Sequence, residues 1–348
     1  MKDFQKHIIS EKASVREALT QLDQIAADAV VFVINDEEEF LGALTDGDIR
    51  RGLIKGFDLE NKIIDFVQPN PKCFRKGIFS LKEMQDWRNN NYRIIPVIDQ
   101  ENKIIEIVNF RHKKSYLPLD AVIMAGGKGT RLLPLTETTP KPLLKIGEKP
   151  IIEYNIDRLS LYGINNITIS VKYLAAQVKD CFQDGSDKNI QISYVEEEDP
   201  LGTLGAVALI EEFTNDYILV MNSDLLTNID YEGMFEDFIN QEADMIVATT
   251  PYEVTIPYGV IETKGNIIKA LKEKPTYTYY SNAGIYIFKK EHLSLIPKNG
   301  FFNATDLIEG LMNTQRKVLH YPIIGYWLDI GKPDDFEKAQ RDIDQIKF

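Results

Sequence analysis

The first third of the chain repeats one pattern of apolar and polar positions. Apolar runs at residues 30–34 and 94–98 are each followed by an acidic turn and a second apolar run, and each is preceded by a segment with helical spacing. Val33 recurs as Val97 and Leu44 as Val108, in each case 64 positions later. We therefore predict two α+β repeats, with helices at Val15–Ala26 and Leu81–Asn89.

The pattern changes after a basic, proline-containing segment at residues 112–119 (HKKSYLPL), which we interpret as a linker. From Asp120 onward, strand patterns alternate with helical patterns, which predicts βαβ units in a doubly wound α/β sheet. Ligands of such sheets bind at the carboxyl ends of the strands. We thus predict domains at residues 1–115 and 120–348. The expected strands are AVIMA, NITISV, ISYV and YILVM, and the expected helices are Ile151–Tyr162, Leu174–Phe182, Leu204–Glu212 and Asp334–Lys347.

Composition narrows the class of protein. With 348 residues, 44% hydrophobic and 27% charged, the chain is typical of globular proteins. The net charge of −13 argues against nucleic-acid binding, which needs a basic face, but a local pocket can still hold phosphates. No apolar stretch approaches the ~20 residues that span a bilayer, and the N-terminus lacks signal-peptide features, so we expect a cytoplasmic protein without membrane partners. Cys73 and Cys181 lack the paired spacing of a zinc site.

A glycine-rich loop, GGKGTRL from Gly126 to Leu132, directly follows the predicted strand AVIMA. Glycines after a strand let backbone N–H groups approach phosphates. The spacing differs from the GxGxxG of dinucleotide-dependent oxidoreductases, and no ribose-binding acid stands about 20 residues later, which argues against that class. A second element, TPKPL, begins at Thr139 and places Lys141 ten residues after Arg131.

The paired signature GGKGTRL and PKPLL resembles the sugar-1-phosphate nucleotidyltransferase family. Further matches follow in order: LGT from Leu201, NSD from Asn222, YGV from Tyr258, EKP from Glu273, NAG from Asn282 and WLDIG from Trp327. The resemblance implies a Rossmann-like, doubly wound mixed sheet of the GT-A-like type. It implies an enzyme that joins a nucleoside triphosphate to a sugar 1-phosphate and releases pyrophosphate. It also implies nucleotide contacts from Ala125, Gly126, Gly127, Gly129, Thr130, Glu197, Leu201, Gly202 and Thr203.

The catalytic residues implied by the resemblance have side chains that suit phosphoryl chemistry. Arg131 can bind the triphosphate bidentately, and Lys141 can neutralise charge near the α-phosphate. Asp224 and Asp329 offer the hard oxygen ligands that Mg²⁺ prefers. Each has a simpler interpretation: the two cations could be solvated surface charges, Asp224 could cap a helix, and Asp329 could be a turn residue. One departure is Ser223, where many family members have glycine.

Sugar 1-phosphate binding is implied for Tyr258, Gly259, Glu273, Lys274 and Asn282. Lys274 is matched to the sugar phosphate and Glu273 to sugar hydroxyls. Alternatively, Glu273 pairs with Lys274 and Asn282 stabilises a turn. A catalytically silent nucleotide-sugar-binding regulator would carry the same motifs, but such chains tend to lose residues of the Arg131, Lys141 or Asp224 type.

Glu197 is expected to read the base. Thymidylyl- and uridylyltransferases of the family carry Gln near this place, whereas an ionised carboxylate accepts from the adjacent N–H donors of guanine. We therefore favour GTP over UTP or dTTP; alternatively, the acidic run at residues 196–199 is a solvated turn. The N-terminal repeat combined with this domain resembles bacterial glucosamine-1-phosphate guanylyltransferases of legionaminic acid pathways, which would make a GDP-glucosamine-type product. Mannose-1-phosphate guanylyltransferases are the alternative, and no residue decides between the two sugars.

The N-terminal repeat resembles a tandem pair of CBS motifs, which sense adenine nucleotides. Thr45 and Asp48 match the family's ribose-binding positions, whereas the second repeat has Asn109 and His112 there. The resemblance therefore implies at most one competent nucleotide site. The alternatives are that Asp48 only caps the following helix and that the repeat is an assembly module. Many relatives are dimers or tetramers, so we also expect a homo-oligomer.

Overall fold

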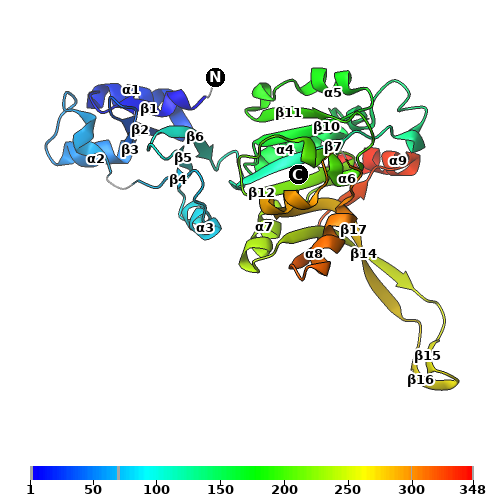
Figure 1. Cartoon of the computed structure of the whole chain (residues 1–348). Coiled ribbons are helices and arrows are strands. Elements are labelled where there is room, and N and C mark those ends of the chain that lie inside the picture. Colours follow the sequence, from blue (N-terminus) through cyan, green and yellow to red (C-terminus); the bar gives the residue numbers. More distant parts are fainter. Residues whose placement is uncertain (1–2, 69–70, 299, 347–348) are drawn as a thin grey trace. The chain divides into compact units, whose positions relative to one another are not determined.

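The computed structural model describes residues 3–68, 71–298 and 300–346, and the chain divides into two compact units between Tyr116 and Leu117 (Figure 1). Because the units are separate bodies, each is described by itself. No helix in the described residues is both long and apolar enough to cross a bilayer.

Two small sheets of the same design form the N-terminal unit, with strand orders β1-β2-β3 and β4-β5-β6. In each, an antiparallel hairpin carries a third, parallel strand on its outer edge. The strands are β1 (Ile8–Ser10), β2 (Val30–Ile34), β3 (Phe40–Thr45), β4 (Phe74–Arg75), β5 (Ile94–Ile98) and β6 (Ile104–Asn109). The helices are α1 (Val15–Ile25), α2 (Asp46–Ile54) and α3 (Leu81–Asn89), with 3₁₀ turns at Asp3–His7, Ala26–Asp28 and Ile63–Phe66.

The 64-residue repeat predicted from the sequence is confirmed in the hairpins. Their strands begin and end at equivalent positions, and the pairing is irregular after Val33 in one copy and after Val97 in the other. The outer strands were not predicted, because β1 and β4 are too short to show a period. The copies also differ: α2 follows β3, whereas residues 110–116, all described, form no helix after β6. Thr45 and Asp48 form a capping box for α2, and Asn109 and His112 replace them in the second copy.

A seven-stranded mixed sheet forms the centre of the C-terminal unit, with the order β11-β10-β7-β12-β17-β14-β18. The first four strands are mutually parallel, and β17 runs antiparallel to both its neighbours. The expected doubly wound mixed sheet is thereby confirmed. The strands are β7 (Leu119–Ala125), β10 (Asn166–Val171), β11 (Gln191–Glu196), β12 (Tyr217–Asn222), β14 (Met245–Thr255), β17 (Thr276–Lys289) and β18 (Val318–Pro322).

Helices cover both faces of this sheet, as the alternating side chains of β12 show. Ile218 and Val220 join a core with residues of the α6 and α8 segments, such as Leu204 and Leu307. Tyr217 faces the other way and packs edge-on against Phe235 of α7. The helices are α4 (Ile151–Leu161), α5 (Ala175–Phe182), α6 (Gly202–Gly205), α7 (Tyr231–Asn240), α8 (Ala304–Asn313) and α9 (Pro333–Asp342).

Two expected helices are shorter than predicted. The segment predicted as a helix at Leu204–Glu212 is the single turn α6 followed by a 3₁₀ turn at Ala206–Leu209. The backbone N–H groups of Leu204 and Gly205, which have no partner inside the first helical turn, donate to the carbonyl of Phe302 and anchor this segment to the start of α8. The closing helix is α9 followed by a 3₁₀ turn at Ile343–Gln345, and the predicted end at Lys347 lies outside the described residues.

A long ribbon leaves the sheet where β14 and β17 continue beyond their neighbours (Figure 1). β14 pairs with β18 only as far as Thr249, whereas it pairs with β17 as far as Thr255. The hairpin of β15 (Val260–Lys264) and β16 (Ile267–Lys272) forms the tip. We call residues 250–281 the arm; all of them are described, and none is buried.

Candidate active site

The glycine-rich loop leaves the carboxyl end of β7 and turns sharply. Gly129 has a φ of 62°, and a Cβ there would lie 3.0 Å from the Cβ of Lys141, so a glycine allows the loop to pack on this lysine. Thr136 fixes the loop by donating from Oγ1 to the carbonyl of Gly129 at 2.9 Å. Ala125 is buried at the strand end, whereas Gly127 and Thr130 are exposed.

Two cationic side chains stand on 3₁₀ turns beside this loop. Arg131 lies on the turn Thr130–Leu132, and its guanidinium group packs against Gly331. A Cβ on Gly331 would lie 3.3 Å from the guanidinium nitrogens. Lys141 begins the turn Lys141–Leu143 and is only 8% exposed. Its Nζ forms an ion pair with Oδ2 of Asp224. The two predicted cations are therefore held beside the same loop at one edge of the sheet.

A short antiparallel strand pair brings the two predicted metal ligands together. β13 (Leu225–Thr227) pairs with β19 (Trp327–Asp329), so that Leu225 lies opposite Asp329. The amide of Ile330 also donates to the carbonyl of Asp224 at 3.0 Å. Asp224 precedes β13 directly, and the pairing thus holds the two carboxylates as neighbours across the strands.

Asp329 has the electrostatic character of a cation ligand. Its Oδ1 is buried and has no hydrogen-bond partner among the described residues. Burial, and next the nearby charge of Asp224, raise the pKa of the Asp329 carboxyl above its usual value, against the opposing effect of Lys141 and Arg131. A buried carboxylate oxygen without a partner is costly unless a cation or proton meets it. The residues present therefore fit a divalent metal ion.

Asn155 is a supporting residue that the sequence analysis missed. It is buried on α4, and its Nδ2 donates to the carbonyl of Leu225 at 2.9 Å and to that of Ser223 at 3.5 Å. It thus fixes the backbone on both sides of Asp224. The signal was a lone Asn inside the apolar helix IIEYNI, where an unpaired amide would be unfavourable.

Glu197 borders the glycine-rich loop at the end of β11. Its Oε1 accepts from the hydroxyl of Ser170 at 2.5 Å, and its Oε2 accepts from the amide of Leu201 at 3.1 Å. A Cβ on Gly126 would lie 2.8 Å from Oε1, so the loop backbone packs directly against this carboxylate. Glu197 is 8% exposed and therefore organises the loop around it, whatever else it contacts.

The segment that follows Glu197, residues 201–203, is fixed by hydrogen bonds to the start of α8. The carbonyl of Leu201 accepts from the amide of Phe302, and Oγ1 of Thr203 accepts from the amide of Ala304 at 2.7 Å. These contacts join the loop to the start of α8, which fixes its position on the sheet.

Of the five predicted sugar-phosphate residues, four lie on the arm and only Asn282 lies on the central sheet. Tyr258, Gly259, Glu273 and Lys274 all belong to the arm, where Tyr258 is 74% exposed. Asn282 lies at the root of the arm opposite Thr249, and its Oδ1 accepts from the amide of Gly284 at 2.9 Å. Asn282 thus has the turn-stabilising contact that the sequence analysis gave as its alternative.

Thr45 and Asp48 border a cavity of about 500 Å³ in the N-terminal unit, which residues of both repeats line. Oδ2 of Asp48 accepts from Oγ1 of Thr45 at 2.6 Å, and Oδ1 accepts from Gln68 and Arg51. Burial alone would raise the pKa of Asp48, but these hydrogen bonds outweigh it and lower the pKa. Asp48 caps α2 in this structure, as the alternative interpretation expected.

The C-terminal unit is a doubly wound α/β domain with a glycine-rich loop, two cations and two carboxylates at one sheet edge. The Nucleotidyl transferase family description matches residues 120–346, and the chain belongs to this family. The CBS domain description matches residues 3–55.

Curated relatives support the family but differ in substrate. The mannose-1-phosphate guanylyltransferase of Mycobacterium tuberculosis is 31% identical over 65% of this chain and 64% of its own length. The UTP–glucose-1-phosphate uridylyltransferase of Synechocystis is also 31% identical, over 63% of its length. The D-glycero-α-D-manno-heptose 1-phosphate guanylyltransferase of Aneurinibacillus thermoaerophilus is 32% identical and is matched over 98% of its length. The chain therefore spans somewhat under two thirds of the first two relatives.

A crystal structure of a Bacillus anthracis protein, described as a glucose-1-phosphate thymidylyltransferase in complex with sucrose, is similar in fold. The TM-score is 0.55 and the identity 26%, over 66% of this chain and 97% of the other.

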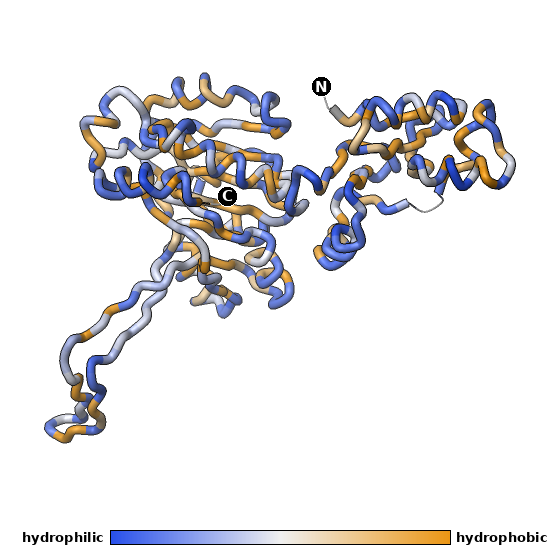
Figure 2. Tube along the Cα trace, turned by 180° about the vertical axis from the view of Figure 1, so that it is seen from behind, coloured by the Kyte–Doolittle hydropathy of each residue, from blue (hydrophilic) through white to orange (hydrophobic). Residues whose placement is uncertain are grey.

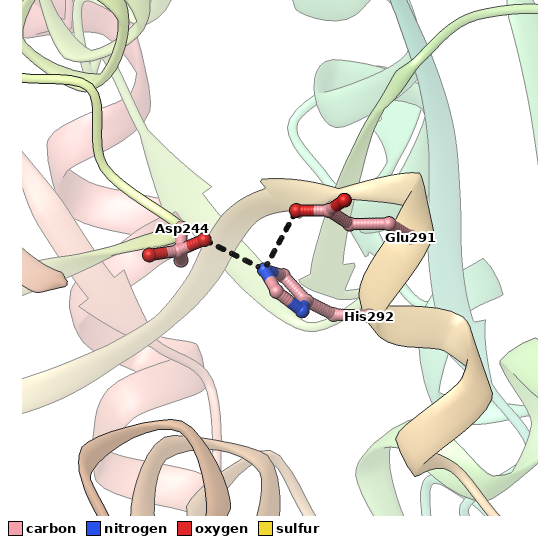
Figure 3. Close-up of side chains that lie close together, drawn as sticks. All are labelled: Asp244, Glu291 and His292. Atoms are coloured by element: carbon pink, nitrogen blue, oxygen red, sulfur yellow. Dashed lines mark hydrogen bonds and ion pairs between the residues drawn. The ribbon is translucent and has the colours of Figure 1, made fainter. Parts of the chain in front are cut away.

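The site formed by Arg131, Lys141, Asp224 and Asp329 is called the strand-end site below. Three other side chains, Asp244, Glu291 and His292, lie close enough together to hold a metal ion (Figure 3). Asp244 is already surrounded by donors, with His292 Nε2 at 3.0 Å, the amide of Lys317 at 3.0 Å and Lys289 Nζ at 3.3 Å. Burial opposes its ionisation, but these hydrogen bonds prevail and lower the pKa of Asp244. We interpret the group as a structural junction of β14, β17 and the segment before β18.

Asp244→Ala should lower the free energy of unfolding by about 1–3 kcal/mol, because it leaves the buried His292 and the Lys317 amide without their acceptor. Urea denaturation measures this loss. The matched control is Glu291→Gln, whose carboxylate is 61% exposed and 3.7 Å from His292, and which should change stability little. A melting temperature that rises with added zinc in the wild type but not in Asp244→Ala would contradict the structural interpretation.

Proposed function

We propose that this chain transfers a nucleotidyl group from a nucleoside triphosphate to a sugar 1-phosphate, giving an NDP-sugar and pyrophosphate. The observation that carries the proposal is the convergence of Arg131, Lys141, Asp224 and Asp329 beside the glycine-rich loop. Two anions must be brought together in this reaction, and a site with buried positive charge beside exposed loop amides suits that task.

The reaction needs no nucleophile from the protein. An oxygen of the sugar phosphate, already ionised, attacks the α-phosphorus in line, and the bond to the β-phosphate oxygen breaks so that pyrophosphate leaves. Arg131 is proposed to bind the triphosphate, and Lys141 to neutralise charge near the α-phosphate. The loop amides from Gly126 to Thr130 are proposed to hold the phosphates in register.

Asp224 and Asp329 are proposed to hold Mg²⁺, a hard cation that prefers carboxylate oxygens. When bound, the ion would neutralise charge on the phosphate oxygens. The unpartnered Oδ1 of Asp329 supports this assignment, and so does the raised pKa of its carboxyl. Lys141 is paired with Asp224 in this structure, which places its ammonium group beside the proposed metal ligands.

GTP is the triphosphate that we favour. Glu197 lies against the loop with both oxygens accepting hydrogen bonds, and each carboxylate oxygen retains a further lone pair for a guanine N–H. The guanylyltransferases among the relatives support this preference, whereas the uridylyltransferase of equal identity keeps UTP as the alternative. For the sugar we retain glucosamine 1-phosphate and mannose 1-phosphate, and the relatives add a manno-heptose 1-phosphate.

A regulatory nucleotide is proposed for the cavity beside Thr45 and Asp48. The cavity has a volume of about 500 Å³, which is large enough for a nucleotide. Lys72 and Arg93 line the cavity and offer positive charge for a phosphate group. Because Asp48 is bonded to Gln68 and Arg51, a ribose hydroxyl must displace one of them or use a free lone pair.

Asp224→Asn and Asp329→Asn should each lower kcat by at least about 10²-fold, because each removes one charged ligand from the proposed metal. Pyrophosphate release at saturating Mg²⁺, with each of four triphosphates and the three sugar phosphates, measures turnover. The control is Asp334→Asn, an exposed carboxylate at the start of α9. Near-normal turnover in both site variants would overturn the metal assignment, and no release by the wild type with any substrate pair would overturn the proposed reaction.

Glu197→Gln should shift the preference between GTP and UTP or dTTP by about 1–3 kcal/mol toward the pyrimidine, measured as the ratio of kcat/KM values. Ser170→Ala is the matched control, since it removes a hydrogen bond to Glu197 without changing the acceptor presented to the base. The Ser170→Ala variant should lower kcat/KM by the same factor for every triphosphate. If Glu197→Gln also lowers kcat/KM by the same factor for every triphosphate, the carboxylate supports the loop and does not select the base.

Titration calorimetry of the whole chain should detect AMP, ADP or ATP binding, with guanine nucleotides as the comparison. Ala43→Leu adds volume to the cavity lining without touching the Thr45–Asp48 capping box, so it should abolish the signal while circular dichroism stays unchanged. Silence of the wild type toward every nucleotide up to a few millimolar would leave the N-terminal unit as an assembly element.

A further inference from the structure

The arm is amphipathic but exposed on both faces. Tyr252 pairs with Tyr279, and Val254 with Tyr277, so that four apolar side chains share one face of the ribbon. On the other face, Glu253 lies opposite Thr278 and Thr255 opposite Thr276, and only the pair of Pro251 and Tyr280, nearer the sheet, is apolar. An antiparallel ribbon with this alternation is typical of one solvated and one covered face. Nevertheless, Tyr252 and Tyr279 are 62% and 59% exposed.

The tip continues the uncovered apolar surface. Ile261 lies opposite Leu271 across the β15–β16 hairpin, and these side chains are 52% and 66% exposed. Ile267 and Ile268 are 64% and 62% exposed. Apolar residues recur along the outer half of the arm in Figure 2. An isolated two-stranded hairpin is marginally stable in water, so this surface needs a covering partner.

The arm carries residues that the chain's own strand-end site lacks. Glu273 and Lys274, which the family resemblance matches to sugar hydroxyls and to the sugar phosphate, lie just beyond Thr276, where the β14–β17 ladder ends. From Asn282 at the sheet edge to Thr276 the strand extends six residues, roughly 20 Å at 3.3 Å per residue. The pairing is continuous between Thr249 and Thr255, so bending the ribbon back onto its own sheet would break backbone hydrogen bonds. A second molecule can receive the arm without that loss.

Charge also suits a second copy of this chain. The arm contains four Lys and three Glu, for a net charge of +1, within a chain whose net charge is −13. A slightly basic arm is therefore complementary in charge to the acidic remainder of the chain. Reciprocal exchange between two copies forms a closed twofold assembly, which leaves neither arm uncovered.

We propose that two copies of this chain exchange arms, so that each arm covers the partner's strand-end site and supplies Glu273 and Lys274 to it. The partner is a second copy, and the site is incomplete without it. This inference rests on the proposed function for the sugar 1-phosphate as substrate, and on the family resemblance for the roles of Glu273 and Lys274 in binding it.

Intersubunit complementation tests the exchange. Asp224→Asn and Lys274→Ala chains are each expected to be nearly inactive alone. When they are co-expressed with different tags, half of the dimers are mixed, and one site in each mixed dimer combines an intact body with an intact arm. The pool should therefore show about a quarter of wild-type kcat. If each arm served its own body, the pool would show only the average of the two variants, and the exchange would be overturned.

The negative control pairs Asp224→Asn with Asp329→Asn. Both changes lie in the body, so no combination of arms restores a site, and the pool must stay inactive. Rescue in this control would mean that the recovered activity does not report on arm exchange, and would overturn the interpretation.

A second variant keeps the test independent of Lys274. An Asn-Gly turn can replace residues 256–275, because Thr255 and Thr276 lie directly opposite each other. We expect this variant, called the armless-tip chain because it lacks residues 256–275, to be inactive alone. Co-expression with Asp224→Asn chains should restore about a quarter of wild-type kcat. Full activity of the armless-tip chain alone would overturn the proposal, even while wild-type turnover upholds the proposed function. Full activity of Lys274→Ala alone would instead overturn only the assignment of that residue.

Discussion

The proximity of two carboxylates governs the architecture of the strand-end site. The β13–β19 pair holds Asp224 and Asp329 together, and burial, followed by the charge of Asp224, raises the pKa of the Asp329 carboxyl. Lys141 compensates one of them through its ion pair, and Asn155 fixes the backbone around Asp224. The divalent cation proposed for this site would relieve the repulsion between the two carboxylates, while the paired backbone holds them in place.

Glu197, where the base is expected to bind, is also held in a fixed position by its surroundings. Glu197 is fixed from two sides, by a hydroxyl on β10 and by the amide of Leu201, and the close approach of Gly126 leaves no room for another side chain. A carboxylate held this firmly has a defined set of free lone pairs. Specificity at such a position follows from the cost of leaving a buried group unpaired rather than from the strength of one contact.

Sequence reasoning predicted the features that depend on local pattern. The 64-residue repeat, the mixed sheet and the adjacency of the glycine-rich loop to a strand all follow from periodicity or motif. It missed Asn155, whose partners Ser223 and Leu225 are about 70 positions away in sequence. It also predicted one helix from Leu204 to Glu212, where the structure has a single α turn and a 3₁₀ turn. Proximity that depends on long-range pairing leaves little trace in local sequence.

The arm shows most clearly what a strand pattern leaves open. Alternation along Tyr252, Glu253, Val254 and Thr255 specifies that one face is to be covered, but it is silent on which molecule covers it. The continuous β14–β17 ladder supplies the missing constraint, since a straight ribbon carries its tip away from the sheet that bears it. If the proposed sugar-phosphate residues lie on such a ribbon, the active site is complete only in a dimer. The specific activity should then fall on dilution, as mass action separates the copies.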